Sequence, residues 1–71
     1  KAVELYRQAA DKGNANAMYN LGVCYANGSG VEKDIDKAEM LLRKAVEFGL
    51  TEAEPILEKV IKERSIGSES K

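Results

Sequence analysis

The chain has 71 residues, of which 44% are hydrophobic and 32% charged, and eleven basic against twelve acidic residues leave a net charge of −1. This balance is typical of one small helical domain and lacks the basic footprint of a nucleic-acid-binding protein, so we expect no nucleic-acid partner. No apolar run approaches the roughly 18 residues of a membrane span, so no membrane partner is expected. Cys24 is the single cysteine, which excludes an intrachain disulfide.

The first part of the chain predicts two helices separated by a glycine. Apolar residues recur at helical spacing over residues 1–12, and Gly13 follows as a stop in the left-handed conformation. Asn14 then caps a second helix that runs to about Ala26. Its predicted buried stripe consists of Met18, Leu21 and Tyr25.

A glycine-rich break over residues 27–30 separates this helix from a third one. Asp34 is its natural N-cap, and Gly49 ends it as Gly13 ended the first. The arc of apolar residues is broad enough to imply neighbours on two sides, and it consists of Ile35, Ala38, Leu41, Leu42, Ala45 and Val46.

A capping box of Thr51 and Glu54 opens the predicted fourth helix, with Pro55 in its first turn. The apolar face consists of Ile56, Leu57, Val60 and Ile61, and the helix is predicted to end at Arg64. Residues 65–71 have no periodicity, so we expect a mobile tail.

The chain also matches itself at an offset of 36 residues, when residues 1–25 are laid over residues 37–61. The coinciding pairs are Lys1/Lys37, Ala2/Ala38, Leu5/Leu41, Arg7/Arg43, Ala9/Ala45, Gly13/Gly49, Ala17/Ala53 and Leu21/Leu57. Because this offset is about ten turns at 3.6 residues per turn, equivalent helices present the same face. The pattern predicts a stacked helical array.

Residues 17–38 resemble the pattern of a Sel1-like repeat, Ala-x-x-x-Leu-Gly-x-x-Tyr-x-x-Gly-x-Gly-Val-x-x-Asp-x-x-Lys-Ala. The chain reads Ala-Met-Tyr-Asn-Leu-Gly-Val-Cys-Tyr-Ala-Asn-Gly-Ser-Gly-Val-Glu-Lys-Asp-Ile-Asp-Lys-Ala there, and the resemblance extends over about residues 1–61. The structural positions of the motif are Leu21, Gly22, Tyr25, Gly28, Gly30, Val31, Asp34, Ala38, Ala45 and Gly49.

The resemblance implies an all-α, tetratricopeptide-like solenoid, a right-handed αα-superhelix of four antiparallel helices. In it Gly22 would let the paired helix approach closely, Gly28 and Gly30 would shape the loop, and Val31 would anchor that loop in the core. We expect the chain to be the C-terminal fragment of a longer array. Its expected parts are the second helix of a truncated repeat (1–14), one complete repeat (15–50), a capping helix (51–64) and a flexible tail (65–71).

Departures from the pattern support a cap at the fourth helix. Pro55, Glu58 and Ile61 stand where Tyr19, Gly22 and Tyr25 stand one repeat earlier. A close-packing glycine is needless where no further helix docks, so this helix is expected to present charged residues to water. They are Glu54, Glu58, Lys59, Lys62 and Glu63.

The candidate binding surface is the face of the second helix opposite its buried stripe. In tetratricopeptide-like stacks this helix lines the concave surface, where peptides usually bind, and amides with a tyrosine suit hydrogen bonding to an extended partner. The predicted partner-binding residues are Asn16, Tyr19, Asn20, Val23, Asn27 and, on the fourth helix, Lys59. The alternative is an ordinary solvated face of small polar residues.

No residue pattern predicts a catalytic, metal or cofactor site. Cys24 has no histidine to activate it, which favours a half-buried structural thiol. The acidic residues around Asp34 lack the loop pattern of a calcium site and are explained by capping. We therefore expect no enzyme activity, no cofactor and no metal.

Two functions remain open. The first is a protein-interaction module, a scaffold or adaptor that docks partner proteins or peptides. The alternative is a helical regulatory or docking segment of a larger enzyme whose catalytic part lies upstream, and the full-length sequence would discriminate between them. The lone cysteine favours a reducing compartment such as the cytoplasm, although related repeats also occur in secretory-pathway adaptors.

A further expectation follows for the N-terminal helix: if the array is truncated there, as the resemblance implies, this helix would lack a neighbour on its N-terminal side. A wide apolar face of Val3, Tyr6 and Ala10 is therefore expected to be exposed. Exposed apolar patches favour self-association, so we expect the chain to self-associate through this helix.

Overall fold

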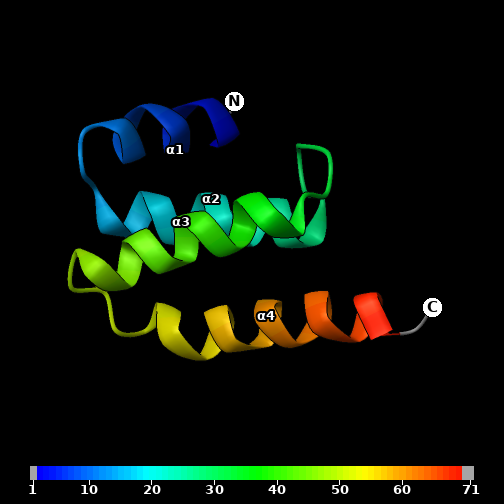
Figure 1. Cartoon of the computed structure of the whole chain (residues 1–71). Helices are drawn as coiled ribbons and strands as arrows, with labels where there is room; N and C mark the ends of the chain where they lie inside the picture. Colours follow the sequence, from blue (N-terminus) through cyan, green and yellow to red (C-terminus); the bar gives the residue numbers. More distant parts are fainter. Residues whose placement is uncertain (1, 70–71) are drawn as a thin grey trace.

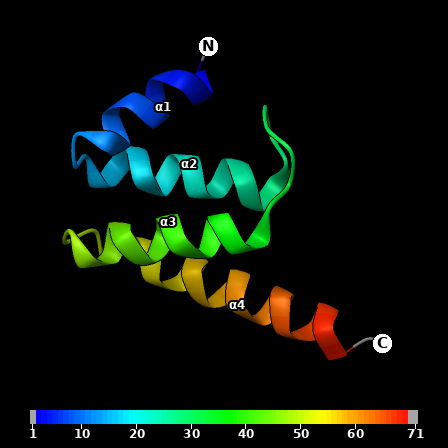
Figure 2. The ribbon, with the colours of Figure 1, turned by 45° about the horizontal axis from the view of Figure 1, so that its top comes forward.

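The computed structural model describes residues 2–69, and the side chains of residues 3–65. These residues form four helices, α1 (Ala2–Asp11), α2 (Ala15–Asn27), α3 (Ile35–Glu47) and α4 (Ala53–Glu69). Each helix runs antiparallel to the one before it and packs against it (Figures 1 and 2), and α2 also touches α4. The predicted all-α, tetratricopeptide-like fold is confirmed.

Side-chain caps open the two middle helices. The Asn14 side chain accepts a hydrogen bond from the Ala17 N–H at 3.1 Å, and Asp34 Oδ1 accepts one from the Lys37 N–H at 3.1 Å. Each bond satisfies a backbone donor that the first turn of a helix leaves unpaired. Both predicted caps are therefore confirmed.

The fourth helix differs from its prediction at both ends. It opens on a backbone turn, because the Glu54 N–H donates to the carbonyl oxygen of Thr51 at 3.0 Å, so the predicted side-chain capping box does not form its start. It continues to Glu69 rather than ending at Arg64, since extending an existing helix costs much less than nucleating one. Residues 70 and 71 of the expected tail lie outside the described residues, and its mobility stays a prediction.

The hydrophobic core lies where α2, α3 and α4 meet. Its buried cluster consists of Met18, Ala38, Leu42, Ala45, Ala53 and Val60. Ala17 and Leu21 on α2 are buried as well. Among residues 3–65, four of the eight buried apolar residues are alanines, which keep the helix axes close. Tyr25 and Leu41, expected on the buried faces, are only half-buried.

Gly22 is a position at which α2 and α3 approach each other closely. A Cβ atom built there would lie 2.9 Å from Leu42 Cγ and 3.3 Å from the Ala38 carbonyl oxygen. Real Cβ atoms essentially never come within 3.0 Å of another heavy atom, so a larger residue at Gly22 would require a shift of the Leu42 side chain or of α3. The expected close approach at Gly22 is confirmed.

The loop between α2 and α3 is held differently from the prediction. Val31 is half-buried and lies outside the core cluster, so it does not anchor the loop in the core. Instead, the loop lies against α1: a Cβ atom on Gly30 would lie 3.0 Å from Val3 Cγ2. Gly30 also has a φ of 78°, a left-handed conformation that glycine adopts without strain.

The apolar face of α1 is also corrected. Val3, Tyr6 and Ala10 are half-buried, and Ala10 packs against the core cluster. Spaced three and four residues apart, they share the side of α1 that faces the rest of the molecule. Leu5 points away from them and is 65% exposed, so the exposed apolar residue of α1 differs from those expected.

We predict that Gly22→Ala lowers the melting temperature. Overpacking of this kind costs about 1–3 kcal/mol, which outweighs the gain of about 1 kcal/mol from the better helix propensity of alanine. Each kcal/mol corresponds to about 4–8 °C for a domain of this size. Thermal unfolding followed by circular dichroism measures the change.

The matched control is Asn16→Ala, at an exposed position of the same helix. It should leave the melting temperature unchanged or raise it slightly. A Gly22→Ala variant as stable as this control would show that α2 and α3 are not in tight contact.

Candidate functional site

A groove of about 570 Å³ lies between α2 and α4. Both helices run in the same direction (Figure 1), one repeat apart in the sequence. The lining residues are Tyr19, Val23, Ala26 and Asn27 from α2, with Ile56, Lys59, Val60, Lys62 and Glu63 from α4. The volume is in the range of sites that take one or a few side chains of a ligand.

The groove exists because α3 holds the two helices apart. α3 packs extensively against both α2 and α4, whereas those two make only a small direct contact. Leu42, with no exposed surface, fills the space beneath them. What remains between α2 and α4 is open along about 12 Å, the helical rise over the eight residue steps from Tyr19 to Asn27.

The floor of the groove is apolar and its rim is polar. Val60 is buried at its base, and the half-buried Tyr19, Ala26 and Ile56 pack against the core cluster beside it. Asn27 and the three charged residues of α4 are exposed. This arrangement can bury an apolar side chain of a partner while polar groups remain beside it.

The structure brings together four of the six predicted binding residues. Tyr19, Val23, Asn27 and Lys59 line the groove. Asn16 and Asn20 do not line it; Asn16 is exposed and Asn20 half-buried. That any of these residues binds a partner stays a prediction.

The predicted binding residues did not include the other five that line the groove, Ala26, Ile56, Val60, Lys62 and Glu63. The internal repeat offers a signal for one of them, because Glu63 lies 36 positions after the predicted Asn27. Ile56 and Val60 were assigned to the apolar face of α4 as core residues. Both residues contact the core and also line the groove. The spacing of apolar residues alone does not distinguish a core residue from one that also lines a groove.

The charges of the rim do not cancel. Glu63 forms an ion pair with Lys33, from the loop before α3, with 3.9 Å between Nζ and Oε2. Among the side chains of residues 3–65, neither Lys59 nor Lys62 has an ion-pair partner. The lining itself contains two lysines and one glutamate, a surplus of one positive charge, and the ion pair with Lys33 offsets part of the charge of Glu63.

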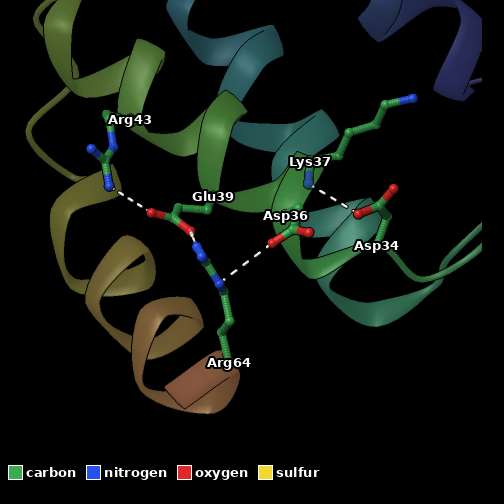
Figure 3. Close-up of polar contacts among 6 residues, drawn as sticks. All are labelled: Asp34, Asp36, Lys37, Glu39, Arg43 and Arg64. Carbon is green, nitrogen blue, oxygen red and sulfur yellow. Dashed lines mark hydrogen bonds and ion pairs between the residues drawn. The ribbon is translucent and has the colours of Figure 1, made fainter. Parts of the chain in front are cut away.

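A network of two arginines and two carboxylates fixes α4 against α3 (Figure 3). Arg64 Nε lies 3.4 Å from Asp36 Oδ1, and Arg64 Nη1 donates to Glu39 Oε1. Arg43 Nη2 donates to the other oxygen of Glu39, Oε2, at 2.5 Å. Only 15% of the Glu39 side chain is exposed, so it is shielded more than an ordinary surface ion pair.

Tyr25 connects three consecutive helices. Arg7 of α1 donates a hydrogen bond from Nη2 to the Tyr25 hydroxyl, at 3.4 Å. Lys37 Nζ of α3 lies 5.5 Å from the centre of the Tyr25 ring. A cation at that distance from an aromatic face is attracted by it. These contacts give Tyr25 a role in helix packing.

Within residues 2–69, no group of three or more His, Cys, Asp or Glu residues is arranged to hold a metal ion. Cys24 is half-buried, with a free thiol. In the same part of the chain, every helix is too short or too polar to cross a bilayer.

A family model described as Sel1 repeat matches residues 1–14 and 15–47. The chain belongs to the Sel1-repeat family. The first segment ends one residue before α2 begins, and the second spans α2, the glycine-rich loop and α3. Sel1 repeats are protein–protein interaction modules, so this is the functional class of the chain.

Curated proteins match the Sel1-repeat segment over small parts of their own length. The chain is 42% identical to chitin synthase regulatory factor 3 of Schizosaccharomyces pombe over 53 residues, covering 75% of this chain and 6% of that protein. It is 43% identical over 47 residues to the ERAD-associated E3 ubiquitin-protein ligase component HRD3 of Candida glabrata, covering 66% of the chain and 6% of HRD3.

A bacterial relative matches over more of the chain. The alginate biosynthesis protein AlgK of Azotobacter vinelandii is 37% identical over 60 residues, which cover 84% of this chain and 13% of AlgK. No solved structure matches the chain. The chain thus spans a small fraction of each relative, and those proteins' names describe them as regulatory or biosynthetic proteins or as a component of a ligase.

We predict that Arg64→Gln destabilises this Sel1-repeat domain by about 1 kcal/mol at low salt. The change removes both ion pairs between α4 and α3, although solvent screening limits each half-exposed pair. The loss should shrink in 1 M sodium chloride, because salt screens exposed charges. Urea unfolding at the two salt concentrations measures it.

Arg43→Gln is the control, since Arg43 and Glu39 lie on the same helix. That variant should lose about 0.3–0.5 kcal/mol, the usual value for such a pair within a helix. Equal losses in the two variants would contradict a specific role of Arg64 between the helices.

Proposed function

We propose that this chain docks a segment of a partner protein in the groove between α2 and α4. The apolar floor from Tyr19, Ile56 and Val60 beneath an exposed polar rim carries the proposal. The open length of about 12 Å accommodates about four residues of an extended segment, at 3.3 Å for each residue. The module would act as a scaffold or adaptor without catalysis of its own.

The proposed function implies a division of the chain into repeats, with one groove between each pair of consecutive repeats. We propose that residues 15–50 form a complete repeat, that residues 1–14 end a preceding one, and that residues 51–64 act as a capping helix. The family matches over residues 1–14 and 15–47 support the first two parts. Glu58, exposed where α2 has Gly22, supports the cap, because a charged side chain opposes close packing of a further helix.

The alternative is that the chain serves as a docking segment of a larger enzyme. One relative is named as a component of an E3 ubiquitin-protein ligase. The chemistry of the groove would be the same in both cases, and only the identity of the docked protein would differ. The sequence of the full-length protein decides between the two.

We predict that Val23→Glu reduces partner binding at least tenfold without unfolding the chain. A carboxylate at this position of the groove would have to lose water when an apolar partner side chain enters, which is costly. Quantitative affinity capture compares the partners retained by wild type and variant, and circular dichroism checks the fold.

Asn16→Glu is the matched control, because it adds the same charge to an exposed position of α2 outside the groove. It should retain the partners of the wild type. If Val23→Glu also retains them while it remains folded, the groove is not the docking surface.

A second proposal concerns self-association through α1. The exposed apolar residue that supports it is Leu5, which is 65% exposed. The residues predicted from the sequence, Val3, Tyr6 and Ala10, are half-buried. We predict that the wild type sediments with a concentration-dependent increase in weight-average mass, and that Leu5→Gln reduces this increase. A wild type that stays monomeric at millimolar concentration would refute it.

A further inference from the structure

The groove between α2 and α4 has an electrostatic polarity that narrows the chemistry of its occupant. Its lysines lie on α4 along one wall, with Lys59 one turn after Ile56 and Lys62 nearer the Asn27 end. The other wall, from α2, carries no charged residue among those that line the groove. A bound segment would therefore meet apolar surface near Tyr19 and positive charge farther along.

The positive charge belongs to this site and not to the molecule as a whole. The chain has a net charge of −1, whereas the residues that line the groove include two lysines and one glutamate, a surplus of one positive charge. Glu63 is the acidic residue of the lining, and its ion pair with Lys33 reduces its repulsion of an acidic ligand. Lys59 and Lys62 remain available, because neither is paired within residues 3–65.

The apolar floor of the groove indicates which uncharged side chains a bound segment would carry. Val60 and the half-buried Ile56 and Val23 present branched aliphatic surface, which matches an aliphatic side chain in shape and polarity. Tyr19 packs against the core cluster, which restricts its ring as a platform for stacking. A nucleic acid would find a single half-buried aromatic ring in the lining, whereas single-stranded nucleic acids are bound by stacking successive bases on aromatic side chains.

We infer that the groove selects a short extended protein segment in which one or two aliphatic residues lie beside acidic residues. The aliphatic residues occupy the floor at Val23, Ile56 and Val60, and the acidic residues lie against Lys59 and Lys62. This inference rests on the proposed function, because it names the chemistry of the segment that the same groove would dock. It gives the partner a sequence signature.

The test uses the 71-residue chain and a displayed library of random nine-residue peptides. Peptides are selected on the wild type, and those that also bind Val23→Glu are removed. The enriched peptides are expected to combine aliphatic with acidic residues. In the best synthetic peptide, replacing each Glu and Asp with Gln and Asn should weaken binding about fivefold to tenfold, as expected for two exposed ion pairs.

The double variant Lys59→Gln/Lys62→Gln should bind the acidic and the amide peptide equally. The matched control, Lys12→Gln/Lys44→Gln, changes two exposed lysines outside the groove and should keep the preference. The ratio of the affinities for the acidic and the amide peptide should also fall as salt rises from 50 to 500 mM, because screening weakens exposed ion pairs. Fluorescence anisotropy of the labelled peptides measures each affinity.

Three results would overturn the inference, and they differ in whether they also contradict the proposed docking in the groove. Neutral or basic peptides that bind the wild type and not Val23→Glu would refute the acidic preference and support docking in the groove. If no peptide distinguishes wild type from Val23→Glu, both proposals fail. Dimers that Val23→Glu dissociates would show a second copy in the groove.

Discussion

The contact between Gly22 of α2 and Leu42 of α3 is the constraint on which the rest of the structure depends. Leu42 is fully buried, and its Cγ would lie only 2.9 Å from a Cβ atom at Gly22. The two helix axes therefore lie as close as a side chain of this size permits. Because α4 packs on the same helix α3, this contact also sets where the outer helix can lie.

The groove follows from that arrangement rather than from a dedicated motif. One helix, α3, uses one side for α2 and another for α4, so these two parallel helices are neighbours without filling the space between them. Arg64 fastens α4 to α3 through Asp36 and Glu39, near the charged end of the groove. The binding surface is thus a product of stacking, and the charges on α4 give it a chemical preference.

Local signals made most of the fold predictable from the sequence. Asn14 and Asp34 cap helices through their own side chains, and Gly13 and Gly49 adopt the left-handed conformation expected of helix stops. These features depend on a few consecutive residues, which a sequence displays directly. The role of Gly22 was also predictable, because the family pattern marks that position.

Features that depend on neighbours distant in the sequence were not predictable in the same way. Val31 was expected in the core, but the loop that carries it lies against α1 at Val3 and Gly30. The outward direction of Leu5 follows from how α1 packs on α2, which the apolar spacing of α1 alone leaves open. The sequence pattern assigned Ile56 and Val60 to the core. Only the arrangement of α2 and α4 in space shows that they also line a groove.

Tyr25 has a consequence for how the molecule unfolds. Its hydroxyl accepts a bond from Arg7 and its ring attracts Lys37, so one side chain couples the helix before its own to the helix after it. Repeat arrays are usually described by interactions between adjacent units alone. Both contacts of Tyr25 join neighbouring helices, so a displacement of α2 would loosen its attachment to α1 and to α3 at the same time.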